Sequence, residues 1–228
     1  MSGDTNIAVI ASVLADATRV TVLHTVGDGR AYTAKELARQ AGVAPSTMSM
    51  HLTKLLEHNL LTMEKQGRHH YFSLANPAII GVLEELAMFA PAKNVRTLRD
   101  ATASEAVRRA RTCYNHLAGT LGVGLTEALL QKSFLLVVDD GYVLSQEGEQ
   151  WARGLGIHVP DKKAGNALFV PRHIDWSERR HHLAGTFGAA LTHRLFELEW
   201  VRRIPTSRAI RVTEEGQRAF HRDFELNV

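Results

Sequence analysis

Apolar side chains recur every three or four positions in residues 7–26, which is the spacing of one face of an α-helix. The Gly-Asp-Gly sequence at 27–29 ends this pattern, because glycine pairs of this kind favour turns. Thr33 and Glu36 have the spacing of a capping box, in which each residue satisfies a backbone N–H near the other. The pattern therefore predicts a long helix followed by a short one that ends at Gly42.

Pro45 suits the first turn of a third helix over residues 45–58, because its missing N–H would have no partner there. Two strand-like runs follow at residues 60–64 and 70–74, and Gly67 lies in the connection between them. Two short helices around a glycine-containing turn are typical of a helix-turn-helix, and a following hairpin makes it a winged helix.

The later part of the chain contains an internal duplication. Residues 116–126 and 182–192 share the sequence His-Leu-Ala-Gly-Thr at their start, at an offset of 66 positions. We expect each copy to form helix, turn, helix, hairpin and helix, with the first long helix running from about residue 103 to residue 119. In the second copy, Asp175 and Glu178 have the spacing of another capping box and predict a helix start.

The predicted fold class is mainly α with small β-hairpins (α+β): an N-terminal winged helix-turn-helix followed by two tandem winged-helix-like repeats. The expected domains are residues 1–91 for the winged helix, 92–158 for a linker helix and the first repeat, and 159–228 for a linker and the second repeat. In the repeats the second helix lacks a Ser/Thr-rich start, so we expect them to serve sensing or dimerisation rather than DNA reading.

Composition restricts the function classes. The chain has 27 Lys and Arg against 24 Asp and Glu, and no third of it is strongly basic, so any nucleic-acid contact depends on a few placed groups. No apolar run reaches the roughly 18 residues of a membrane span, so no membrane partner is expected. A single cysteine excludes an internal disulfide and favours a cytoplasmic location.

Four short segments together resemble the ArsR family of bacterial winged-helix repressors: residues 15–19, 36–43, 46–52 and 67–71. The resemblance covers roughly residues 6–90. The run Arg-Thr-Cys-Tyr-Asn-His-Leu-Ala-Gly at 111–119 resembles a C-terminal extension of one subgroup. The family implies a homodimer on double-stranded operator DNA, with the second helix of each helix-turn-helix in the major groove and the wing on the neighbouring backbone or minor groove.

We expect the DNA contacts to come from the second helix of the helix-turn-helix and from the wing. Short hydroxyls reach bases or phosphates, Lys54 suits a phosphate, and Arg68 suits a narrow minor groove. For His51, packing within the domain stays an alternative. The predicted DNA-binding residues are Ser46, Thr47, Ser49, Met50, His51, Lys54, Arg68 and Tyr71.

The resemblance also raises metal sensing, but the family's usual ligands are absent here. The helix over residues 35–41 has no cysteine, and the helix over residues 78–89 has neither Asp nor His. No cofactor is therefore predicted. For a small-molecule effector, the candidate residues are Cys113, Tyr114, His116, Trp176 and His182.

Two alternatives to the effector remain open. One is a metal- or haem-responsive sensor in which Cys113 and His116 converge with His181, His182 and Glu178 across a pseudo-twofold axis. The other is a DNA-bound module that recruits a partner protein.

An enzyme is not expected. The glycine-rich residues 119–124 follow no predicted strand and precede no Lys-Ser/Thr pair, so they are not a phosphate loop. The prediction for the whole chain is a DNA-binding transcriptional repressor, released or modulated by an effector in the duplicated C-terminal domain.

Overall fold

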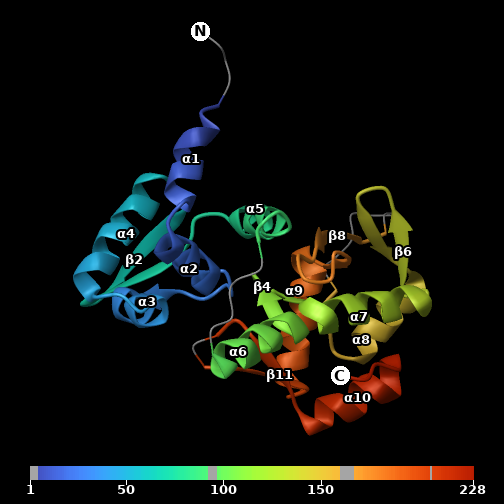
Figure 1. Ribbon diagram of the computed structural model, residues 1–228. Helices are drawn as coiled ribbons and strands as arrows, with labels where there is room; N and C mark the ends of the chain where they lie inside the picture. The colour runs from blue at the N-terminus through green and yellow to red at the C-terminus, as the bar shows by residue number, and fades with distance from the viewer. Residues whose placement is uncertain (1–4, 92–96, 160–166, 206) are drawn as a thin grey trace. The chain divides into compact units, whose positions relative to one another are not determined.

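The computed structural model describes residues 5–91, 97–159, 167–205 and 207–228. The chain divides into two compact units, Met1–Val82 and Leu83–Val228 (Figure 1). The boundary falls inside α5 (Ala78–Ala87). The predicted linkers overlap residues 92–96 and 160–166, which lie outside the described residues. The elements of the first unit before α5 are α1 (Ile7–Leu14), α2 (Ala17–Val26), β1 (Tyr32–Thr33), α3 (Ala34–Ala41), α4 (Pro45–Glu57), β2 (Leu61–Gln66) and β3 (His69–Leu74).

The prediction of one helix over residues 7–26 is wrong, because two helices meet there at a bend of 91°. Asp16 begins the second helix, since its carboxylate accepts a hydrogen bond from the backbone N–H of Arg19 at 3.0 Å. The Arg19 side chain donates to the carbonyl of Val13 at 2.5 Å, near the end of the first helix. The Asp16 side chain therefore caps a new helix, and the first helix does not continue through this point.

The winged helix-turn-helix of the first unit is confirmed. Thr33 and Glu36 form the predicted capping box at the start of α3, and Gly42 ends that helix at a φ of +66°. α4 begins at Pro45 and packs beside α3 and β2 (Figure 1). β2 and β3 pair in antiparallel register around Gly67, whose φ is +60°, and β1 adds to the other edge of β3.

The second unit contains five further helices and eight short strands among its described residues. They are α6 (Leu98–Arg109), β4 (Arg111–Cys113), β5 (His116–Ala118), α7 (Gly119–Gln131), β6 (Leu135–Val138), β7 (Gly141–Leu144), α8 (Gln146–Gly154), β8 (Phe169–Ile174), β9 (His181–Leu183), α9 (Gly185–Glu197), β10 (Val201–Arg203), β11 (Ile210–Val212) and α10 (Glu214–Phe224).

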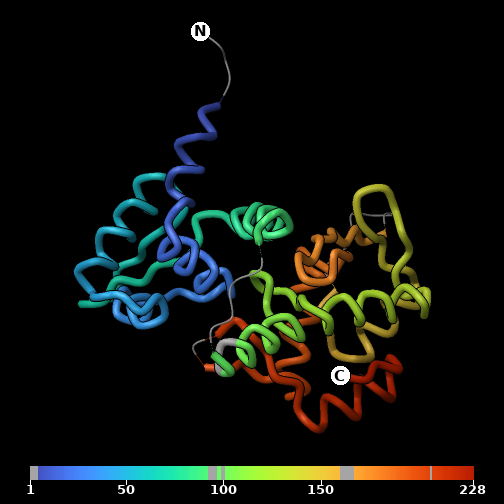
Figure 2. Tube along the Cα trace, viewed as in Figure 1, coloured from blue at the N-terminus to red at the C-terminus, as the bar shows by residue number. Residues whose placement is uncertain are grey.

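The two copies of the duplication interlock. Each runs hairpin, helix, hairpin, helix, and its longest helix packs on the hairpin of the other copy: α7 on β9 and α9 on β5. β7 pairs with β8, which joins β6, β7, β8 and β9 into one four-stranded sheet. Figure 2 lets the reader follow the chain through both copies, from green to red. A single apolar core includes residues from α7, α9 and α10.

Glycines allow each long helix to pass close to the hairpin of its own copy. At Gly122 an added Cβ would lie 2.4 Å from the carbonyl oxygen of Leu117, and at Gly188 it would lie 3.0 Å from that of Leu183. Four residues later in each helix, Thr126 and Thr192 bond back to those glycine carbonyls at 2.9 and 2.8 Å. The duplicated sequence thus produces the same helix–hairpin contact twice.

Two predictions for the duplicated region are wrong. α6 ends at Arg109, and the rest of the predicted long helix is the β4–β5 hairpin, whose turn includes Tyr114 at a φ of +58°. Asp175 and Glu178 begin no helix. The Asp175 carboxylate instead accepts from the backbone N–H groups of Ser177 and Glu178, at 2.9 and 3.1 Å, and closes the β8–β9 loop. Tandem winged-helix repeats are accordingly not confirmed.

None of the helices in the described residues combines the length and the hydropathy that crossing a membrane requires. α1 and α2 meet that test only when they are combined across their 91° bend.

Candidate functional site

Helix α4 has one buried and one exposed face. Met48, Leu52 and Leu55 are buried in the first unit, where they hold the helix against the domain core. Ser46, Ser49, Met50 and Lys54 lie on the exposed side, and Thr47 is half-buried. Met50 keeps 68% of its surface exposed. This division leaves a polar, solvent-facing ridge on a helix that is fixed from behind.

His51 is not part of that ridge. Its side chain is 15% exposed, and its Nδ1 lies 3.6 Å from a carboxylate oxygen of Asp16. The pKa of Asp16 is lowered, first by its hydrogen bond from the Arg19 backbone and further by His51. The position favours the alternative in which His51 supports the junction of α1 and α2 rather than reaching a base.

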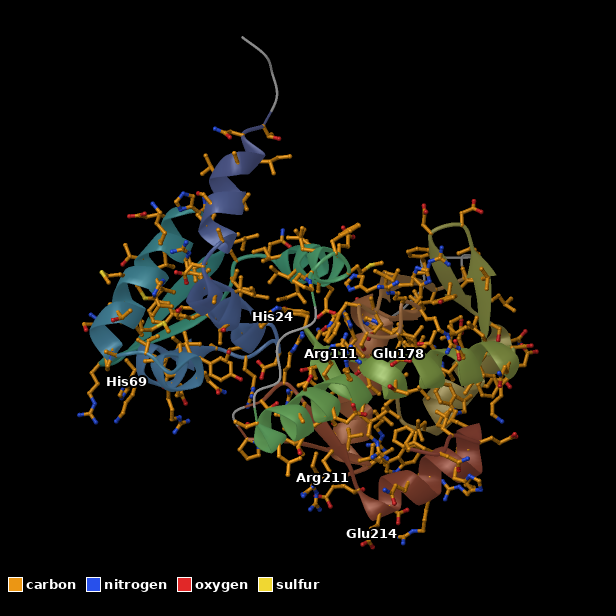
Figure 3. All side chains as sticks on the ribbon, in the orientation of Figure 1. His24, His69, Arg111, Glu178, Arg211 and Glu214 are labelled. Atoms are coloured by element: carbon orange, nitrogen blue, oxygen red, sulfur yellow. The ribbon has the colours of Figure 1, made fainter. Side chains whose placement is uncertain are left out.

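The wing carries polar residues at its tip. Arg68 is exposed, and its Nε lies 3.4 Å from a ring nitrogen of His69, the residue labelled at the end of the hairpin in Figure 3. Tyr71 is half-buried and pairs with Thr33 of β1, so its backbone is part of the sheet. Arg68 is therefore the wing residue best placed for a phosphate or a groove.

A second group of candidate residues is buried in the second unit. Cys113, His116, His173 and His182 each offer one potential ligand atom, and these four atoms lie within 4.8 Å of one another. The Sγ of Cys113 is 4.0 Å from Nδ1 of His173. The three imidazole rings have centroid separations of 5.0 to 6.0 Å. We call these four residues the Cys-His cluster.

Strand pairing explains how the Cys-His cluster forms. Cys113 lies opposite His116 in the β4–β5 hairpin, and His173 lies opposite His182 in the β8–β9 hairpin. Directly opposed residues of an antiparallel pair project to the same face. His116 and His182 are equivalent positions of the duplication, and their cross-strand partners complete the cluster.

His173 was missed by the sequence prediction. The β4–β5 turn has two residues and the β8–β9 loop has six, so the simple 66-residue offset does not match Cys113 with His173. His181, named for the metal alternative, lies outside the cluster, because adjacent strand residues face opposite sides. It is exposed, whereas His182 is buried. The four residues of the Cys-His cluster could have been grouped from the sequence only if both hairpins had been recognised.

Three of the four residues of the Cys-His cluster are buried, and His173 is half-buried. Burial raises the pKa of the Cys113 thiol to about 12 and lowers that of His182 to about 4. Burial also lowers the pKa of His116 and of His173. Among the described residues, Nδ1 of His116 and both ring nitrogens of His182 have no hydrogen-bond partner. An unpaired buried polar group costs about 1–3 kcal/mol of folding free energy, so this arrangement destabilises the fold unless something binds to it.

An ion-pair network lies next to the cluster. The buried guanidinium of Arg111, labelled in Figure 3, donates to Glu84 at 3.0 Å and to Asp175 at 2.9 Å. Arg208 donates to the other oxygen of Glu84 at 2.8 Å. The pKa of Asp175 falls to about 2: burial opposes the shift, but Arg111 and several hydrogen bonds outweigh it. Oδ2 of Asp175 also lies 3.8 Å from Nδ1 of His182.

Three further candidates lie outside the Cys-His cluster: Trp176 and Tyr114, predicted for the effector, and Glu178, predicted for the metal or haem alternative. Trp176 stacks under Arg111, with 4.9 Å between the guanidinium carbon and the ring centroid. Tyr114 occupies the β4–β5 turn and is half-buried. Glu178 accepts a hydrogen bond from Thr120 at 2.8 Å and is not in the Cys-His cluster.

Residues 14–64 match a family described as a helix-turn-helix domain. Over 223 residues the chain is 40% identical to an uncharacterized HTH-type transcriptional regulator, YdfF, of Bacillus subtilis (strain 168), and the match covers 98% of this chain and 99% of YdfF.

Solved structures match only part of the chain. NolR from Sinorhizobium fredii is 24% identical over 38% of this chain and 86% of its own, with a TM-score of 0.35. A homodimeric winged helix-turn-helix domain of Mb0332 from Mycobacterium bovis, titled a possible ArsR-family transcriptional regulator, is 19% identical over 41% of this chain and all of its own, with a TM-score of 0.32.

Because it covers 98% of this chain, the match to YdfF extends well beyond the winged helix into the second unit. YdfF is described as a transcriptional regulator. The chain therefore belongs to the HTH-type transcriptional regulators, and a long C-terminal extension follows its helix-turn-helix domain.

Proposed function

We propose that this DNA-binding regulator is a homodimeric repressor that covers an operator and is released or modulated by a ligand of its second unit. The observation that carries the proposal is the polar ridge of α4, which is exposed while Met48, Leu52 and Leu55 anchor the helix from behind. A rigid helix with short polar side chains at its start is the usual reader of a major groove.

The contacts are assigned by reach and charge. Ser46, Thr47 and Ser49 stand near the start of α4 and are short enough for bases and phosphates at close approach. Met50 offers an apolar surface for a thymine methyl group. Lys54 lies a turn further on, where its ammonium group suits a phosphate, although it now lies 3.4 Å from Glu57. Arg68 and Tyr71 contribute from the wing, and His51 supports the helix from the Asp16 side.

The exposed apolar residues of α1 support the homodimer. Ile7 is 72% exposed and Val9 is 41% exposed, on a short helix that is apolar nearly throughout. Exposed apolar surface of this kind is typical of protein interfaces. A second copy would bring two α4 helices to the same face of a duplex, and they must lie about 34–36 Å apart to enter successive major grooves.

Regulation by the second unit is supported by the burial of several of its candidate residues. Cys113, His116 and His182 are buried, so they suit a small ligand better than a polymer. A coupling free energy of about 1–3 kcal/mol would change operator affinity about 5- to 150-fold.

A second place for a small organic effector is the groove of about 760 Å³ among α6, β11 and α10, which Ala106, Arg109, Ile210 and Gln217 help to line. Pockets of this size and mixed polarity accept drug-sized ligands. Screening cell metabolites for a change in operator affinity tests both places at once.

The test of DNA reading starts with selection of bound duplexes from random sequences by the full-length chain. Its affinity is then measured over a salt series with Lys54→Ala and Arg68→Ala. Each variant is expected to weaken binding and to reduce the slope of log K against log salt by about 0.9 if it loses one phosphate contact. Lys132→Ala, an exposed lysine of the second unit, is the matched control. Unchanged slopes for both variants would refute the assigned contacts.

Repression is tested separately by transcription in vitro from a promoter that carries the selected site. We expect the dimer to reduce transcript, and Ser46→Ala combined with Lys54→Ala to restore it. Increased transcript with the parent protein would show an activator, and a stoichiometric partner without any effect on DNA affinity would favour the recruitment module.

A further inference from the structure

We propose that Cys113, His116, His173 and His182 form a closed, four-ligand site for a divalent first-row transition metal, with Zn²⁺ as the preferred ion. One thiolate and three imidazoles make an N₃S ligand set, which suits metals of borderline softness.

The spacing of the ligand atoms is close to what such an ion requires. With bonds of about 2.0–2.3 Å, a tetrahedral ion separates its ligand atoms by about 3.3–3.8 Å. The four candidate atoms already lie within 4.8 Å of one another, and Sγ of Cys113 lies 4.0 Å from His173. Side-chain rotations that move the ligand atoms by about 1 Å would bring them to this spacing, with no change in strand register.

A second observation points to a ligand independently of this spacing. Cys113, His116 and His182 are nearly or wholly removed from solvent, yet three ring nitrogens of the two histidines have no hydrogen-bond partner in the part of the chain that the structure describes. Histidines that serve only as packing usually bond their ring nitrogens to a neighbouring backbone or side chain. A metal ion would satisfy the nitrogen of each ring that faces the cluster.

The surroundings also resemble those of a metal ligand. The Asp175 carboxylate lies 3.8 Å from Nδ1 of His182, and a carboxylate behind a ligating histidine commonly fixes its orientation. Arg111 and the backbone N–H of Gly119 hold Asp175 in turn, at 2.9 and 2.6 Å. When the ion binds, the thiol gives its proton to solvent and the Sγ–metal bond forms.

This geometry decides between metal chemistries. Four protein ligands fill a tetrahedral shell, so no position is left for water or substrate and a catalytic ion is excluded. Haem does not fit, because haem iron takes at most two protein ligands, on opposite faces of its macrocycle, whereas four ligand atoms converge here. Each ion would instead tie the hairpin of one copy to the hairpin of the other.

The consequence for regulation rests on the proposed function. The ion would fix the β4–β5 hairpin, and Arg111 of that hairpin bonds Glu84 of α5. α5 is also the helix in which the boundary with the first unit falls. Metal occupancy would therefore act on the segment that connects the Cys-His cluster to the DNA-binding unit.

The test uses the full-length protein stripped of metal with a chelator and titrated with Zn²⁺, or with Co²⁺ as a spectroscopic probe. We expect one equivalent per chain, tetrahedral Co²⁺ absorption with a thiolate-to-metal band, and a higher Tm. Cys113→Ser should abolish the thiolate band. His173→Ala should weaken Zn²⁺ binding at least about 100-fold, because even partners that only orient a ligand are worth about 10- to 100-fold.

His181→Ala is the matched control, since this histidine adjoins His182 on β9 but is exposed. It should bind Zn²⁺ and Co²⁺ like the parent chain. Circular dichroism checks that each variant is folded, and His116→Gln provides a second ligand variant of similar size. Parent protein without a bound equivalent, or a Co²⁺ spectrum unchanged by Cys113→Ser, would overturn the site.

Operator binding with and without Zn²⁺ separates the two proposals. Metal binding that leaves operator affinity unchanged would support the site and refute its regulatory role. Loss of operator binding in Lys54→Ala with normal metal binding would support both assignments.

Discussion

The two units of this protein use polar side chains in opposite ways. In the first unit, the polar residues of α4 face solvent and lie over a buried apolar face. In the second unit, the polar and titratable residues of greatest interest lie mostly inside, next to the Arg111 ion pairs. The first arrangement suits a long, charged partner that approaches from outside. The second suits a small ligand that bonds to the unpaired ring nitrogens.

The second unit depends on the balance of its buried charges more than the first unit does, and Arg111→Ala tests this most directly. The substitution leaves the buried Asp175 carboxylate without its guanidinium partner and Glu84 with Arg208 alone. We expect a loss of about 3–5 kcal/mol in unfolding free energy, the usual cost of breaking a buried ion pair.

Tryptophan fluorescence measures that loss selectively, because Trp151, Trp176 and Trp200 all belong to the second unit. The control is Arg202→Ala, which removes an exposed arginine paired with Glu199 and should cost less than about 1 kcal/mol. Equal denaturation midpoints for the two variants would contradict a structural role for the network.

Two methionines of α4 test the division of that helix into a packing face and a reading face. Met48 is fully buried, so Met48→Ala should cost about 2–5 kcal/mol in stability through the cavity it leaves. Met50 is 68% exposed, so Met50→Ala should change stability by no more than about 0.5 kcal/mol but should weaken operator binding. Circular dichroism melts and gel-shift titrations on the same preparations separate the two effects.

The two copies within the second unit differ in how tightly helix meets hairpin. Gly122→Ala places a methyl group 2.4 Å from a backbone carbonyl and should cost about 1–3 kcal/mol, since overpacking of this size forces backbone shifts. Gly188→Ala meets its carbonyl at 3.0 Å and should cost less. Gly154→Ala, which meets nothing within 4 Å, is the control for glycine entropy alone. A reversed order in urea midpoints would contradict the tighter packing of the first copy.

Local sequence rules determined most of the first unit. Thr33 and Glu36 form their capping box, Pro45 begins α4, and Gly67 turns the wing, because each device acts within a few residues of itself. The single N-terminal helix was a wrong prediction for a related reason: apolar spacing continues through residues 7–26, while the Asp16 cap that interrupts it depends on one side-chain hydrogen bond.

The sequence also revealed the duplication, and with it Cys113, His116 and His182 as candidate residues. It could not decide that residues 111–118 are a hairpin, since Cys113 and His116 share a face in a helix as well as across a two-residue turn. Only the tertiary structure brings in His173 and turns His181 outward. The physical reason is that the pairing of β8 with β9 and the packing of α7 and α9 on the opposite hairpins are contacts between distant residues, and these leave no periodic signal in the chain.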